Sequence, residues 1–207
     1  RLLVLSADGC HSLRLLCGNV FDILLVQAVY GREQEEKLEH EFEKEIHLLT
    51  AEPRLKSVAR DFVSHYSDLW TSGKAMFVCL NKVTCVRMYN FVQKYWQDDI
   101  KALEKQIQTA SQQEVQELER KLNWMKETEM AVVISQEQNE IQTFKKWNLD
   151  IKYHREKMEK RELDKEFKDK DNPLRVVFVC AMWLTGFDVK CLSCLYLDKP
   201  LKAHTLM

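Results

Sequence analysis

Short apolar runs alternate with segments of helical periodicity over most of this chain. Four runs are apolar along their length and rich in β-branched, aromatic and cysteine side chains, which is typical of strands buried on both faces. The four runs are Lys74–Leu80, Met130–Ile134, Arg175–Ala181 and Leu192–Leu197. Buried strands separated by helices predict an α/β fold whose sheet is mainly parallel and has helices on both faces.

The helical segments differ in how much apolar surface they present. Arg54–Leu69 and Lys82–Trp96 carry apolar residues at helical spacing, so both are expected to pack on the sheet. The segment Asp98–Glu129 is long and polar and has only a narrow apolar stripe. It predicts a helical insertion at about 98–129, a hairpin that leans on the core and that a short linker could replace. A partner-binding coiled coil is the alternative, but too few clean heptads are present to favour it.

The other segments give less definite patterns. Gln136–Trp147 predicts a helix, Glu33–His47 a charged helix, and His154–Asp171 a solvated, charge-dense connector. Residues 1–31 are apolar and irregular and fit no motif. The chain is therefore divided into an unassigned segment (1–31), a helical approach (32–72) and an α/β lobe (73–207).

Net charge and hydropathy restrict the partners. The formal net charge of the 207 residues is −1, so a contact with nucleic acid would need a local patch rather than a bulk basic field. No apolar run reaches membrane-spanning length, and the first residues do not resemble a secretion signal. We therefore expect a cytoplasmic protein without a membrane partner.

Cysteine and histidine usage gives no clear metal site. Most of the seven cysteines lie inside apolar runs, as expected for reduced core residues. Cys191 and Cys194 form a CxxC, but without a second pair a buried strand is favoured over a zinc or redox site. His40, Glu43 and His47 share one helix face, where a solvated helix is favoured over metal ligation.

Candidate chemistry is expected where parallel strands end, because ligands bind at the carboxyl edge of such sheets. The loops to consider are Asn81–Lys82, Ser135–Gln136 and Met182–Asp188. The chain contains no GxxxxGK[ST] phosphate loop and no acidic pair after an apolar strand. We therefore predict no catalytic residue within this chain.

The order of motifs in the last 41 residues resembles the second RecA-like lobe of superfamily 2 helicases and translocases. The motifs are FKDKDNP (Phe167–Pro173), the strand VVFVCA, MWLTGFD (Met182–Asp188), LYLDKP (Leu195–Pro200) and KAHTLM (Lys202–Met207). The residues of these motifs are similar to those of the motor (R) subunit of type I restriction–modification enzymes. Segments upstream agree, and the resemblance covers roughly Glu39 to Met207: Leu49–Tyr66, Gly73–Trp96, Glu129–Ser135 and Leu149–Met158.

The resemblance implies a RecA-like three-layer lobe within an ATP-dependent DNA translocase and endonuclease. Its implied partners are double-stranded DNA and the methyltransferase and specificity subunits of a restriction complex. ATP and Mg²⁺ would be bound mainly by a first lobe that this sequence lacks, so the chain alone is expected to show neither ATPase nor nuclease activity. Two departures stand out: Val189–Lys190 replaces the usual small residue and proline, and no arginine-bearing helix follows HTLM.

The resemblance also implies site residues. It assigns Gly186 and Asp188 to nucleotide binding, where a plain turn is the local alternative. It assigns Asn81, Lys82 and Thr185 to DNA binding. For Asn81 the alternative is a helix cap followed by a solvated lysine, and for Thr185 it is a role in organising the Gly-Asp loop. The alternative function is a degenerate, non-catalytic RecA-like interaction module, which the flanking gene sequence would distinguish from a motor.

Overall fold

A five-stranded sheet forms the centre of the molecule in a computed structural model that describes residues 3–6, 46–183 and 187–199. Its strand order is β1-β5-β2-β4-β3. The strands are β1 (Leu3–Ser6), β2 (Lys74–Cys79), β3 (Glu129–Val133), β4 (Leu174–Val179) and β5 (Leu192–Asp198). Strands β5, β2, β4 and β3 are mutually parallel, and β1 pairs antiparallel with β5. The parallel sheet and its four predicted strands are confirmed; β1 was not predicted.

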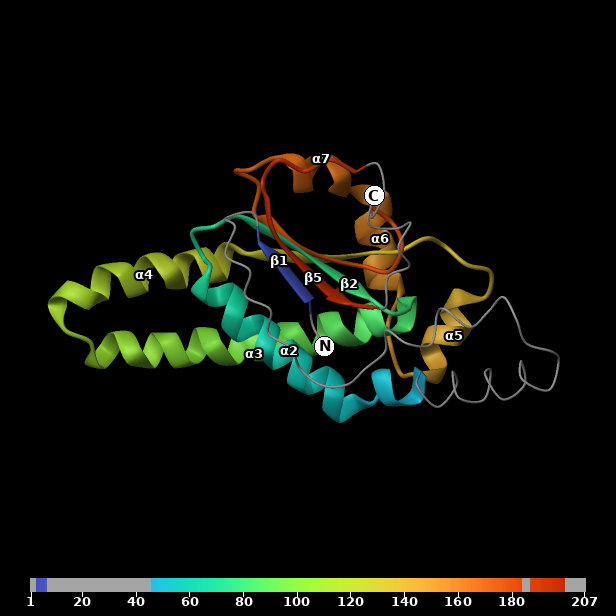
Figure 1. The fold of residues 1–207 in the computed structure, drawn as a ribbon, viewed down its shortest axis with the longest axis horizontal. Coiled ribbons are helices and arrows are strands. Elements are labelled where there is room, and N and C mark those ends of the chain that lie inside the picture. Colours follow the sequence, from blue (N-terminus) through green and yellow to red (C-terminus); the bar gives the residue numbers. More distant parts are fainter. Residues whose placement is uncertain (1–2, 7–45, 184–186, 200–207) are drawn as a thin grey trace, which may run out of the picture.

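Helices cover both faces of the sheet, which confirms the RecA-like α/β class (Figure 1). They are α2 (Glu52–Asp68), α3 (Lys82–Thr109), α4 (Gln112–Glu127), α5 (Glu140–Lys146), α6 (Lys152–Lys160) and α7 (Leu163–Lys168). In Figure 1, α2 and α3 lie below the sheet and α7 lies above it. Among the described residues, no helix combines the length and apolarity needed to cross a bilayer.

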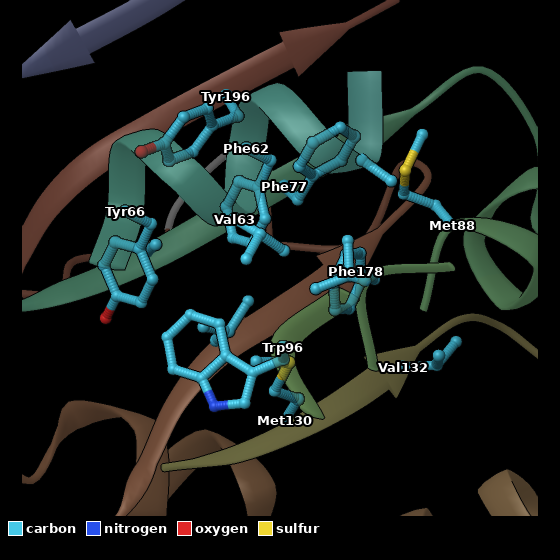
Figure 2. Packing of buried hydrophobic residues seen from close by; sticks show 14 of the residues in the cluster. Phe62, Val63, Tyr66, Phe77, Met88, Trp96, Met130, Val132, Phe178 and Tyr196 are labelled. Carbon is cyan, nitrogen blue, oxygen red and sulfur yellow. The ribbon is translucent and has the colours of Figure 1, made fainter. Parts of the chain in front are cut away.

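The continuous apolar runs of the strands are explained by two apolar clusters, one on each face. Phe77 of β2 points into the larger cluster with α2 and α3, whereas the neighbouring Met76 points into the smaller one with α7. Phe62 of α2 lies at the centre of the larger cluster (Figure 2). Its ring centroid is 5.4 Å from that of Phe77 and 4.7 Å from that of Tyr196. Edge-to-face contacts of this kind add to the free energy gained by burying the rings.

The predicted solvated connector at 154–171 is wrong, because this segment contains most of α6 and all of α7. Each helix buries only one or two side chains, His154 in α6 and Leu163 and Phe167 in α7. So few apolar positions produce no helical periodicity in the sequence. Several charges of the segment are paired instead of solvated; Arg161, for example, contacts both Glu129 and Glu166.

The predicted helical hairpin is present, but its base belongs to the main core. α3 runs without a break from Lys82 through Asp98 to Thr109, and α4 returns after the capping box at Ser111. Near the base, the indole Nε1 of Trp96 donates a hydrogen bond of 3.0 Å to the carbonyl oxygen of Met125. Three residues of the predicted stripe, Leu103, Leu122 and Met125, are buried in the larger apolar cluster, and so is Ile100 of α3. A linker replacing all of 98–129 is therefore no longer expected to leave the fold intact.

The described cysteines are free thiols rather than disulfides. Cys79, Cys85 and Cys194 are buried, and Cys180 and Cys191 are half-buried. Cys79 and Cys194 pack in the larger apolar cluster, so the buried-strand interpretation is confirmed for these two. Cys10 and Cys17 lie outside the described residues.

His154 of α6 is a buried histidine that packs against an aromatic ring. It is 3% exposed, and its Nδ1 has no hydrogen-bond partner within the described part of the chain. Its ring lies edge-on to Tyr89, with centroids 4.7 Å apart. Burial, aided by the nearby positive charge of Lys157 and opposed by Asp150, lowers the pKa of His154 from 6.5 to about 4.

This lowered pKa predicts a loss of stability in mild acid. The histidine takes up a proton near pH 6.5 when unfolded but only near pH 4 when folded. Its stabilising contribution is therefore complete above pH 6.5 and is lost as the pH falls towards 4, by at most about 3 kcal/mol. Urea unfolding at pH 7 and pH 4.5 measures the effect. His154→Phe should show a shallower pH dependence than the wild type, because the group that titrates is gone. Equal pH dependence in wild type and His154→Phe would contradict this account.

Candidate functional site

Strands β5, β2, β4 and β3 are parallel, so all four end at the same edge of the sheet. β2 leads into α3 through residues 80–81, β3 leads into α5 through 134–139, and β4 leads into β5 through 180–191. Lys199 follows the end of β5. Asn81 lies in the loop after β2, Lys82 begins α3 directly after it, and Asp188 lies in the loop after β4; β2 and β4 are neighbours in the sheet. The other predicted site residues, Thr185 and Gly186, lie outside the described part of the chain.

Asn81 caps the N-terminus of α3. Its side-chain oxygen accepts a hydrogen bond of 2.8 Å from the backbone N–H of Thr84. This bond satisfies one of the amides that a helix start leaves without a partner. The local alternative of a helix cap is confirmed for Asn81, and its contact with DNA stays a prediction.

Lys82 begins α3 and is paired rather than solvated. Its Nζ lies 2.5 Å from Oε1 of Glu137, which belongs to the loop after β3. The Lys82 side chain is 20% exposed and the Glu137 side chain 57% exposed. The pair therefore joins the loops after β2 and β3, and solvent reaches it mainly on the Glu137 side.

Arg155 of α6 fixes the loop that carries Glu137. Its guanidinium donates to the two carboxylate oxygens of Glu140, at 2.9 Å and 2.7 Å. It also donates to the backbone oxygens of Ile134 at 2.9 Å and Ser135 at 3.3 Å. Both ends of the loop are thus attached to one side chain. Sequence reasoning missed Arg155, Glu137 and Glu140, because each looks like an ordinary solvated charge in its own segment.

A second set of contacts ties the ends of β4, β5 and β2 together. Lys199 Nζ donates to the carbonyl oxygen of Cys180 at 3.1 Å, and Cys180 Sγ contacts the carbonyl oxygen of Leu80 at 3.6 Å. Burial raises the pKa of the Cys180 thiol, while Lys199 and Lys82 oppose that rise and Glu137 adds to it. Contacts of Cys180 and Lys199 thus hold the carboxyl ends of β2, β4 and β5 together.

Aromatic stacking anchors the loop that carries Asp188. The ring of Trp183 stacks on Phe187 with centroids 4.3 Å apart, and on Phe167 of α7 at 6.0 Å. Lys168 places its Nζ 4.5 Å from the centroid of the Phe187 ring. Asp188 follows immediately and is exposed. The stack thus holds one end of the loop on α7 and leaves the Asp188 carboxylate open to solvent.

A cavity of about 540 Å³ lies between this loop, α6 and α7. Arg155, Arg161, Lys168 and Trp183 are among its lining residues. Both arginines are already paired with carboxylates, Arg155 with Glu140 and Arg161 with Glu166 and Glu129. The cavity therefore offers little unpaired positive charge for an anion.

Comparison with known proteins gives a consistent result. A family model described as "Type I restriction enzyme subunit R domain 3" matches residues 71–207. The chain is 32% identical over 167 residues to the type I restriction enzyme HindI endonuclease subunit of Haemophilus influenzae, a match covering 77% of this chain and 13% of that protein. It is 29% identical over 189 residues to the "Putative type I restriction enzyme MjaIXP endonuclease subunit" of Methanocaldococcus jannaschii, covering 90% of this chain and 15% of that protein. No solved structure gives a significant match.

The extent of the family match agrees with the architecture. It begins just before β2 and includes all four parallel strands. The chain spans only 13% and 15% of the two relatives described above. Because the matched residues are more than half of the chain, it belongs to the R-subunit family of type I restriction enzymes.

Proposed function

We propose that this chain works as the second motor lobe of an ATP-dependent DNA translocase and endonuclease subunit. The subunit would act in the cytoplasm with methyltransferase and specificity subunits on double-stranded DNA. One observation carries the proposal: the predicted DNA residues Asn81 and Lys82 directly follow β2, and the predicted nucleotide residue Asp188 follows the adjacent parallel strand β4. Movement of the lobe about bound nucleotide would therefore carry the DNA contacts with it.

The nucleotide side of the lobe is assigned to Asp188 and Gly186. Asp188 is exposed, and a carboxylate there can accept hydrogen bonds from ribose hydroxyl groups. ATP and Mg²⁺ would be held mainly by a first lobe, so this chain would complete the site rather than form it. The stacked rings of Trp183 and Phe187 support the role by holding the start of the loop in place.

The DNA side is assigned to Asn81, Lys82 and Thr185. Lys82 stands at the first turn of a 28-residue helix, where the helix dipole and free amides also favour a phosphate group. Contacts of this kind bind the DNA backbone irrespective of sequence, as a translocase requires.

A non-catalytic interaction module is the second candidate. Two observations favour it: the Asn81 side chain is used as a helix cap, and Lys82 is already paired with Glu137. In such a module, neither residue would affect DNA binding.

Paired variants in the complete subunit test the proposal. Asp188→Ala should raise the ATP concentration needed for half-maximal DNA-dependent ATP hydrolysis several-fold, while binding of duplex DNA stays nearly intact. Lys82→Ala should weaken duplex binding for all sequences and change the ATP requirement much less. Lys190→Ala, an exposed lysine two residues after Asp188, is the matched control and should behave as wild type. The same defect in both variants, or none in either, would refute the division into a nucleotide side and a DNA side.

A further inference from the structure

The ammonium group of Lys82, which we propose contacts DNA, forms an ion pair with the carboxylate of Glu137 in the same chain. Lys82 Nζ and Glu137 Oε1 are 2.5 Å apart, so the ammonium and the carboxylate form a direct ion pair with no room for water between them. Glu137 is the more exposed partner, at 57% against 20% for Lys82. A ligand approaching Lys82 from solvent therefore meets the carboxylate first.

The position of Glu137 is supported by a buried network. Its backbone N–H donates to Oε2 of Glu140 at 3.3 Å. Glu140 is 7% exposed and is held by two hydrogen bonds from Arg155. Arg155 in turn donates to the carbonyl oxygen of Ile134, the first residue after β3. These hydrogen bonds hold the loop after β3 in place and keep the Glu137 carboxylate next to Lys82.

The surrounding charges would otherwise attract an anion. Besides Lys82, the carboxyl edge carries Lys199, whose Nζ donates to the carbonyl oxygen of Cys180. The positive charges of Lys82 and Lys199 lower the pKa of the Cys180 thiol, and the negative charge of Glu137 raises it. The first turn of α3 contains no acidic residue. Of Lys82, Lys199, Glu137 and the first turn of α3, only Glu137 contributes a negative charge that offsets the positive charges of the two lysines.

We infer that Glu137 competes with DNA for Lys82. A DNA backbone phosphate must displace the Glu137 carboxylate before it can bind the Lys82 ammonium. The inference rests on the proposed DNA role of Lys82. A phosphate offers the ammonium the same kind of anionic oxygen as the carboxylate, and duplex DNA offers many at high local density. Competition lowers the affinity of the lobe for DNA, which favours release when the motor must move along the duplex.

Removing the charge of Glu137 tests the inference. Glu137→Gln keeps the size of the side chain, and in the complete subunit it should bind a fluorescein-labelled 30-base-pair duplex about twofold to fivefold more tightly than wild type, the range that a solvent-accessible ion pair supports. Fluorescence anisotropy measures the dissociation constant. Glu156→Gln removes the same charge from the exposed Glu156–Lys160 pair on α6, and it should leave the affinity unchanged.

A second background separates the inference from the proposed function. In Lys82→Ala, the additional change Glu137→Gln should have no further effect, because the group for which the carboxylate competes is gone. The competitor role would be overturned if Glu137→Gln left the DNA affinity unchanged, or if it still raised the affinity in the Lys82→Ala background. In either case, weaker DNA binding by Lys82→Ala alone would still support the DNA role of Lys82. Wild-type affinity in Lys82→Ala would overturn the DNA role itself. Thermal unfolding of each variant verifies that it is folded.

Discussion

Arg155→Met should lower the free energy of unfolding by about 3–5 kcal/mol, the usual effect of removing one partner from a buried ion pair. The side chains of Arg155 and Glu140 are only 15% and 8% exposed, so the carboxylate left behind would be buried without its counter-charge. The backbone oxygens of Ile134 and Ser135 would also lose a donor. Urea unfolding monitored by circular dichroism measures the change.

A double variant identifies the source of this loss. Arg155→Met combined with Glu140→Leu removes both charges, so it should be less destabilised than Arg155→Met alone. Lys160→Met, which removes a 73% exposed cation from the same helix, is the control and should change stability by less than about 0.5 kcal/mol. A double variant at least as unstable as Arg155→Met would show that the orphaned carboxylate is not the cause.

Shortening the helical hairpin at its tip should leave the fold stable, whereas removing its base should destroy cooperative unfolding. Replacing residues 108–117 with a short linker removes exposed side chains for the most part and should leave one cooperative unfolding transition. Replacing residues 98–129 removes Leu103 and Met125 from the main apolar cluster and Glu129 from β3, so cooperative unfolding should be lost.

Other contacts place the base of the hairpin in the same cooperative unit. The ring of Trp124 lies 5.5 Å from that of Tyr66 in α2, and Arg175 of β4 donates to the carbonyl oxygen of Trp124 at 3.1 Å. Differential scanning calorimetry of the two deletion variants is the measurement. A cooperative transition in the variant that lacks residues 98–129 would show that the fold does not need the base of the hairpin. Residues 98–129 would then be a separable insertion.

The parallel strands could be predicted because both of their faces are buried. A strand such as Met130–Ile134 is apolar throughout, and no surface helix produces that pattern. The edge strand Leu3–Ser6 could not be predicted, because four residues inside an irregular apolar segment define no period. The helices α6 and α7 were missed for a related reason: they bury too few side chains to show an apolar stripe.

The candidate site was predictable only in part. The loops at the carboxyl edge follow from the strand pattern, and a helix cap at Asn81 follows from its place between a strand and a helix. The partners of those residues do not. Glu137 and Lys82 are 55 positions apart and belong to loops after different strands, so only the folded sheet brings them together. The same is true of Arg155 and the backbone oxygen of Ile134.

The salt dependence of duplex binding by Lys82→Ala tests the central claim most directly. If Lys82 neutralises one backbone phosphate, the plot of log binding constant against log salt concentration should be shallower by about one unit than for the wild-type subunit. Lys94→Ala changes an exposed lysine on the same helix and should leave the slope unchanged. A lower slope in Lys82→Ala alone is the result that the motor-lobe account predicts. Equal slopes in wild type, Lys82→Ala and Lys94→Ala would contradict it.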